Sequence, residues 1–301
     1  MTNNQYDELH RYLLNAANVR GELVRLEDSL QKIVHSYEYP LQIQYLLSEM
    51  AAATCLLTAI LKFKGEIGIQ IQSKGPVSYA VINATDDFTL RGVARWDETL
   101  SELPEAFQDL LSDAVMVITI TPEEGERYQG VVPLDKPTLA ECLEGYFTQS
   151  EQLATKVILM TDLQHADRAR SAGMLLQVLP TQASNTDVDQ DTEFEHVSKL
   201  AETLSDKEMF ELPVNDILYR LFHQEEVEVF SPQEVTFACS CSKQRSADAL
   251  RNVDKAELLK IVEEDGAIKM NCQYCHAEYI FDSVDVEAIH AGHFTETRKD
   301  Q

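Results

Sequence analysis

Residues 41–63 read LQIQYLLSEMAAATCLLTAILKF, and this stretch decides the fold. It is apolar on most faces and rich in small residues, which is the pattern of a helix enclosed by other elements. Its most apolar part, residues 51–61, is too short to cross a bilayer and lies beside Glu49 and Lys62. We therefore predict a buried helix enclosed by β-sheets, and no membrane span.

The segments around this helix are rich in β-branched residues, and several of them alternate apolar with polar positions. We predict strands over residues 66–72, 77–83, 89–96, 115–121, 127–133, 156–161 and 174–179. Thr121-Pro-Glu-Glu-Gly125 supplies turn residues between two of these runs, so antiparallel hairpins should dominate. With further helices over residues 29–37 and 138–147, residues 1–180 form a predicted α+β core domain.

The composition excludes some classes of function. Lys and Arg number 25 against 51 Asp and Glu, which gives a formal net charge of -26 over 301 residues. Such a charge repels phosphate backbones and argues against nucleic-acid binding. The opening MTNNQYDELHRY has acidic and amide residues where an export signal has basic residues followed by an apolar stretch, so a cytoplasmic protein is expected.

The amino-acid composition changes at residue 181. Residues 181–192, TQASNTDVDQDT, are polar and acidic, and amphipathic helix patterns follow at 194–204 and 215–225. Residues 181–230 carry 13 acidic and 3 basic side chains, so their helices fold against self-repulsion. We interpret this segment as an acidic helical linker of low stability.

The remaining residues, 231–301, contain two close pairs of cysteines around a predicted helix at about 247–264. The pairs are Cys239-Ser-Cys241 and Cys272-Gln-Tyr-Cys275. This spacing is a strong signal for a tetrahedral four-sulfur metal site, and zinc is the metal it favours, although iron and other thiophilic metals remain open. Because the segment is too small for much core, metal binding should supply much of its folding free energy, on the order of 10 kcal/mol.

Two interpretations of this site remain open on spacing alone. A closed four-ligand zinc site is most often a permanent structural brace. However, a disulfide within Cys-x-Cys or Cys-x-x-Cys closes a very small, strained loop and is easily reduced again. Metal-bound sulfur is a thiolate, which is the form that peroxide oxidises, so the same ligands can also sense oxidants.

Three further residues, two cysteines and one histidine, are not expected to bind the metal. Cys55 lies in the apolar helix and should behave as a small hydrophobic residue. Cys142 lies on a more amphipathic helix, where a buried structural position is still expected. His276 follows Cys275, but four sulfurs complete the ligand shell, so we do not assign it to the metal.

Several segments together resemble the heat shock protein 33 family, the 33-kDa redox-regulated chaperonins. The similar segments are DELHRYL at 7–13, RGELV at 20–24, RGVAR at 91–95, TITPEEGERYQG at 119–130 and GMLLQVLP at 173–180. The family's C-x-C and C-x-x-C ligands correspond to Cys239, Cys241, Cys272 and Cys275. The resemblance covers the whole chain.

The resemblance implies a cytoplasmic, ATP-independent holdase that is inactive while one Zn²⁺ per chain is bound to reduced cysteines. Oxidation would pair Cys239 with Cys241 and Cys272 with Cys275. Zinc loss would then unfold residues 231–301, loosen the linker, expose apolar surface for unfolding client proteins and favour a homodimer. No enzymatic activity is implied, and the sequence has no phosphate loop or dinucleotide fingerprint.

Two other functions remain as alternatives. One is a zinc-ribbon adaptor that binds a protein or nucleic acid without switching; residues 231–301 carry 13 acidic and 8 basic side chains, which argues against nucleic acid. The other is a thiol oxidoreductase that uses Cys272 and Cys275. That class places its pair beside a βαβ pattern rather than opposite a distant C-x-C.

Overall fold

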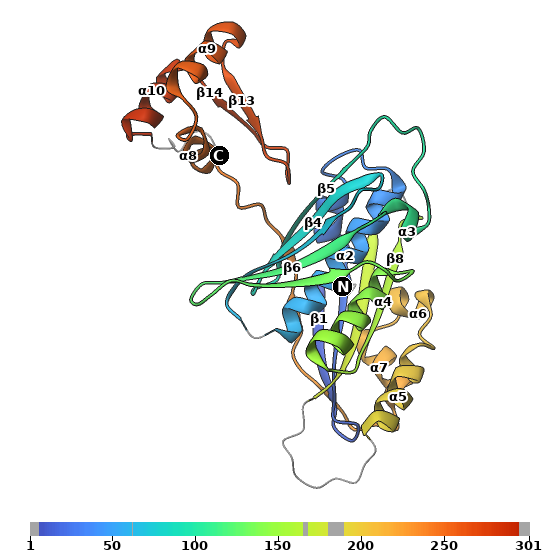
Figure 1. The fold of residues 1–301 in the computed structure, drawn as a ribbon. Coiled ribbons are helices and arrows are strands. Elements are labelled where there is room, and N and C mark those ends of the chain that lie inside the picture. The colour runs from blue at the N-terminus through green and yellow to red at the C-terminus, as the bar shows by residue number, and fades with distance from the viewer. Residues whose placement is uncertain (1–5, 62, 165–167, 180–189, 295–301) are drawn as a thin grey trace. The chain divides into compact units, whose positions relative to one another are not determined.

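The computed structural model describes most of the chain in two compact units, Met1–Ala238 and Cys239–Gln301. The described residues are 6–61, 63–164, 168–179 and 190–294. Figure 1 traces the order of the helices and strands in each unit.

The first unit is built on two six-stranded sheets. Sheet A has the order β10-β1-β2-β9-β8, with β11 also paired to β1. Its strands are β1 (Glu8–Leu14), β2 (Val19–Leu26), β8 (Thr155–Asp162), β9 (Arg170–Val178), β10 (Val227–Val229) and β11 (Gln233–Glu234). Sheet B has the order β12-β5-β4-β3-β6-β7. Its strands are β3 (Gly65–Gln72), β4 (Val77–Thr85), β5 (Thr89–Trp96), β6 (Val115–Pro122), β7 (Tyr128–Pro133) and β12 (Thr236–Phe237).

All seven predicted strands form, and antiparallel pairing dominates as expected. Every neighbouring pair is antiparallel except β12 and β5, which run parallel. The β6–β7 hairpin turns at the predicted Pro-Glu-Glu-Gly stretch, where Gly125 has a positive φ of 111°. The strands β1 and β2 were not predicted.

The predicted central helix is α2 (Leu41–Ile60), and it packs between the two sheets. It contacts β2, β8 and β9 of sheet A and β3, β4 and β5 of sheet B. By length and composition α2 could span a membrane, but 78% of its apolar stretch is buried, as in the core helix of a globular domain. The α+β class with sheets around a buried helix is therefore confirmed.

Shorter helices complete this core. Two of them match predictions: α1 (Asp28–Val34) and α4 (Leu139–Tyr146). A capping box at α4 explains its start, because Thr138 and Glu141 satisfy each other's backbone N–H groups. The α4 helix continues into a π-helical turn, η1 (Phe147–Glu151), and α3 (Phe107–Leu110) lies in the connection before β6.

Three helices cover the other face of sheet A. They are α5 (Gln190–Ala201), α6 (Asp206–Glu211) and α7 (Val214–Phe222), and Figure 1 shows them grouped along one side of this unit. The patterns at 194–204 and 215–225 correspond to α5 and α7, while α6 was not predicted. The polar stretch that opens the predicted linker lies at 181–189 outside the described residues. The helices α5, α6 and α7 belong to the first unit.

The second unit is small. It contains α8 (Lys243–Leu250), α9 (Lys255–Asp265), the hairpin β13 (Ile268–Asn271) and β14 (Glu278–Phe281), and α10 (Ser283–Ala291). The single helix expected at about 247–264 is two helices. Asp254 accepts hydrogen bonds from the N–H groups of Ala256 and Glu257, so a new helix begins there.

Candidate metal centre

The second cysteine pair lies in the turn of the β13–β14 hairpin. The N–H of Cys272 donates to Ala277 O, and the N–H of His276 donates to Cys272 O, both at 2.9 Å. His276 has a φ of 56°, so the chain reverses through a left-handed residue directly after Cys275. This tight turn holds Cys272 and Cys275 on the same side of the hairpin end.

The first pair precedes α8 and is fixed by the start of that helix. Ser242 is the N-cap, and its Oγ accepts a hydrogen bond from the Arg245 N–H at 3.1 Å. The Arg245 guanidinium donates to Ser240 O at 2.8 Å and to Ser240 Oγ at 2.7 Å. Because Ser240 separates Cys239 from Cys241, these bonds set the path of both cysteines.

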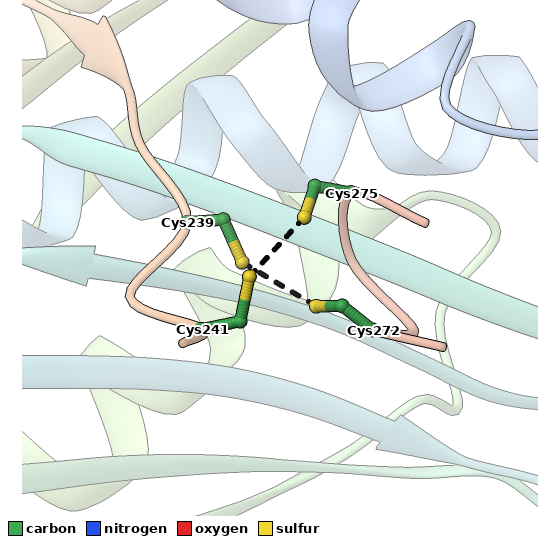
Figure 2. Close-up of side chains that lie close together, drawn as sticks. All are labelled: Cys239, Cys241, Cys272 and Cys275. Carbon is green, nitrogen blue, oxygen red and sulfur yellow. Dashed lines mark hydrogen bonds between the residues drawn. The ribbon is translucent and has the colours of Figure 1, made fainter. Parts of the chain in front are cut away.

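The four sulfurs point toward one another (Figure 2). All four lie within 4.8 Å of one another, and two sulfurs of different pairs are 3.5 Å apart in Cys239–Cys272 and 3.3 Å apart in Cys241–Cys275. All four are free thiols. A tetrahedral Zn–S₄ centre with bonds of about 2.3 Å has sulfur–sulfur edges of about 3.8 Å, so the sulfurs are spaced as metal binding requires. The donor set therefore fits zinc or another thiophilic metal.

Burial and hydrogen bonds shift the pKa values of the cysteine thiols in different directions. Burial raises the pKa of the Cys239 and Cys275 thiols. Burial also acts to raise the pKa of Cys272. Hydrogen bonds from the N–H groups of Cys275 and Tyr274, together with those to the Cys239 and Cys241 side chains, lower it, and the net shift is downward. The surroundings of Cys272 therefore favour its thiolate.

Tyr279 on β14 is a contact that the sequence did not reveal. Its hydroxyl donates to Cys241 Sγ at 3.1 Å, and this bond, together with burial, raises the pKa of Tyr279. A donor to a ligating sulfur orients it and adjusts its charge. The alternation of the strand after Cys275 is visible in the sequence, but the reach of the hydroxyl to a sulfur 38 positions earlier is not.

The apolar core beneath the cluster is limited. Its buried members are Ala247, Leu250, Leu258, Ile268, Phe281, Val286, Ile289 and Phe294. A core of this size gives marginal stability, so a bound metal would contribute much of the folding free energy of residues 239–294.

The other cysteines lie apart from this cluster, in the first unit. Cys55 is completely buried in α2 and Cys142 is 2% exposed in α4, and burial raises the pKa of both thiols. Both are inert core residues, as predicted. Among the described residues, the group suited to a metal ion contains the four cysteines and not His276.

Comparison with known proteins agrees with this arrangement. A model of the family described as "Hsp33 protein" matches residues 7–282. The 33 kDa chaperonin of Pseudoalteromonas atlantica is 63% identical over 297 residues, which covers 98% of this chain and 99% of the relative. The 33 kDa chaperonin of Shewanella sediminis is 55% identical over 283 residues, covering 94% and 95%.

A solved structure shares the fold. The crystal structure of the 33 kDa chaperonin, an Hsp33 homologue from Thermotoga maritima, superposes with a TM-score of 0.78 at 21% identity. The alignment covers 95% of this chain and 99% of the other. From the family match and the identity to curated relatives, the chain is a member of the Hsp33 family of chaperones.

Proposed function

We propose that this chaperone is an ATP-independent holdase controlled by a zinc–thiolate switch formed by Cys239, Cys241, Cys272 and Cys275. The observation that carries the proposal is the convergence of four free sulfurs in a unit with a small core. In the reduced protein they would hold one Zn²⁺, and the chaperone would be inactive. Zinc would supply folding free energy to residues 239–294 and keep the sulfurs as thiolates.

Oxidation balances as a four-electron reaction. The four thiolates lose four electrons to two molecules of peroxide, four protons are taken up, and two disulfides, four molecules of water and free Zn²⁺ result. A disulfide sulfur is a far weaker metal ligand than a thiolate, so the metal leaves. The unit then keeps only its small apolar core.

We propose the pairing of Cys239 with Cys241 and of Cys272 with Cys275, although sulfurs of different pairs also lie 3.3 and 3.5 Å apart. Once the unit unfolds without metal, the loop to be closed decides the pairing. Thiols two or three residues apart meet far more often than thiols 33 or 34 residues apart. Cleavage between Cys241 and Cys272 followed by mass spectrometry tests this: peptides that separate without reductant support local pairs, and linked peptides contradict them.

The segment between α7 and Cys239 connects the cysteine cluster to the linker helices, and its weak pairing supports transmission of unfolding from one to the other. Between α7 and Cys239 the chain is held by β10, β11 and β12, which contain three, two and two residues. Such short pairings are marginal on their own. Unfolding of the second unit would therefore loosen them and the acidic helices that precede them.

The surface under α5, α6 and α7 is a suitable client site. Sheet A presents an apolar face there that includes Leu23, Met174 and Leu176, covered by residues such as Ile217 and Phe222. Release of the helices would expose both sets of apolar side chains, and exposed patches of this kind bind unfolding proteins. We therefore propose three functional regions: a core domain at 1–180, a linker at 181–230 and a zinc-binding domain at 231–301.

Further elements of the proposal are a homodimer on activation, a cytoplasmic location, no nucleic-acid or membrane partner and no enzymatic turnover. The net charge of -26 supports the absence of nucleic acid.

One experiment tests the switch. Zinc-loaded reduced protein is treated with peroxide at mild heat while zinc release, thiol content and light scattering by an aggregating client are followed together. We expect zinc release to accompany suppression of aggregation, with Cys142→Ala behaving as wild type and Cys239→Ser releasing zinc without oxidant. Zinc release with unchanged aggregation would refute the switch and favour the zinc-ribbon adaptor.

A further inference from the structure

A cavity of about 480 Å³ opens beside the first half of α2, in the first unit. One wall comes from α2 and includes Tyr45 and Glu49; the other comes from residues before β6 and includes Glu105 and Phe107. The Gln42 amide donates to Leu103 O at 3.2 Å and ties the two walls together. This bond holds the segment before β6 against α2.

Glu49 is the unusual residue of this cavity. Its side chain is half-buried, and no described residue donates a hydrogen bond to its carboxylate or forms an ion pair with it. Burial raises its pKa to about 7. Partial desolvation without a donor disfavours the charged form of a carboxylate, so a cationic partner would relieve an existing penalty.

The rim of the cavity is apolar and open to solvent. Leu41 and Tyr45, which both line it, are 51% and 38% exposed. Apolar side chains gathered beside a cavity mark binding surfaces more often than isolated exposed ones do. Tyr45 and Phe107 also provide aromatic rings near the carboxylate, which suits a guanidinium.

We propose that this cavity binds an arginine side chain flanked by apolar residues in an extended segment of a client protein. The guanidinium would pair with Glu49, while the flanking residues would contact Leu41 and Tyr45. The fork of donors on arginine matches a carboxylate and its planar face stacks on aromatic rings, which a lysine ammonium does less well. The net charge of -26 adds long-range attraction for basic segments.

This site would be independent of the redox switch. None of the cysteines lines the cavity, and every lining residue lies in the first unit between Leu41 and Leu110. The inference rests on the assignment as a chaperone, not on zinc or disulfides. The reduced protein would thus already hold basic–apolar segments weakly, before the larger apolar surface is released.

The test uses full-length, zinc-loaded, reduced protein and a fluorescent peptide with one arginine between leucine and phenylalanine. A matched peptide carries citrulline, which is neutral and nearly the same shape, in place of arginine. We expect the arginine peptide to bind at least about ten-fold more tightly than the citrulline peptide. Glu49→Gln should abolish that difference, and Glu124→Gln, with the same change of charge on the β6–β7 turn, should not.

Two further measurements test whether the peptide binds at Glu49 in this cavity. Binding of the arginine peptide should weaken as the pH falls from 8 to 6, because protonation of Glu49 competes with the guanidinium, and Glu49→Gln should remove this slope. Tyr45→Arg places a cation four residues from Glu49 on the same helix face and should block the peptide without unfolding the protein.

Equal affinity of the two peptides for wild type, or of Glu49→Gln and wild type for the arginine peptide, would overturn the proposal. Binding of butylguanidinium as tight as that of the whole peptide would also overturn it, because the apolar rim would then have no role. Peptide binding that appears only after oxidation would overturn the independence from the switch. Normal zinc release on oxidation of Glu49→Gln would show that the switch stands separately.

Discussion

Arg25 on β2 donates a hydrogen bond from Nη2 to the main-chain oxygen of Leu212, with a separation of 2.6 Å. Leu212 is the residue that ends α6, so the bond joins sheet A to the helices that cover it. Arg25 is 2% exposed, and water therefore cannot replace this partner while the helices are in place. Tyr6 makes a parallel bond, from its hydroxyl to Phe210 O at 2.5 Å.

We predict that Arg25→Met loosens α6 and α7 in the reduced protein. Loss of a buried hydrogen bond from a charged donor weakens their attachment by about 1.5–3 kcal/mol. Amide exchange across 206–222 should accelerate, and the reduced protein should suppress client aggregation partially without oxidant. Arg91→Met, which removes an ion pair with Glu66 on sheet B, is the matched control. Unchanged exchange across 206–222 would mean that Arg25 does not secure the helices.

Tyr279→Phe should weaken metal binding without removing a ligand. The change deletes the hydroxyl that donates to Cys241 Sγ at 3.1 Å and keeps the ring. Partners of this kind contribute about 10–100-fold to metal affinity. Competition of zinc-loaded protein with a chromogenic chelator measures the effect, and Tyr274→Phe in the same turn serves as comparison. Equal zinc affinity of Tyr279→Phe and wild type would assign the hydroxyl no part in holding the metal.

Ile289→Ala should make the second unit more dependent on its metal. Ile289 is fully buried in a core of eight residues, and a large-to-small change of this kind costs about 2–5 kcal/mol. We expect residues 239–294 to stay folded with zinc and to be unfolded after chelation, with zinc lost at lower peroxide than in wild type. Proteolysis in the two states reports this. Val284→Ala, at an exposed position of the same helix, is the control.

The parts of this fold that were predicted are those where one physical cause dominates. The α2 helix is apolar on most faces because two sheets enclose it, and the strands of sheet B alternate because one face is solvated. The strands β1 and β2 were missed for the opposite reason. Sheet A is covered on one face by α2 and on the other by α5, α6 and α7, so residues such as Leu9 and Tyr12 are buried on opposite faces and no two-residue period appears.

The site was predictable to a similar extent. The two cysteine pairs identify four candidate ligands because metal geometry restricts both spacing and residue type. Tyr279 was missed because its contact with Cys241 depends on how the hairpin packs against a segment 38 positions away. The cavity at Glu49 was missed because a glutamate on an apolar helix looks like an ordinary solvent contact until the opposite wall at Phe107 is known.

Glu22 on β2 makes the stability of the first unit depend on pH. It is 3% exposed, its Oε2 has no hydrogen-bond partner among the described residues, and burial raises its pKa to about 7 against the attraction of Arg20 and Arg11. Because the folded protein holds this proton more tightly than the unfolded chain, the unfolded state ionises first as the pH rises. The contribution of Glu22 to stability is therefore lost between about pH 4.5 and 7.

We predict that Glu22→Gln removes this loss. The difference in unfolding free energy between variant and wild type should grow in favour of the variant from pH 5 to 8, by at most about 3 kcal/mol. Urea unfolding followed by the fluorescence of Trp96, the single tryptophan, reports the first unit alone. Glu124→Gln on the exposed β6–β7 turn controls for net charge. Parallel pH profiles for Glu22→Gln and wild type would mean that Glu22 ionises as readily in the folded state as in the unfolded chain.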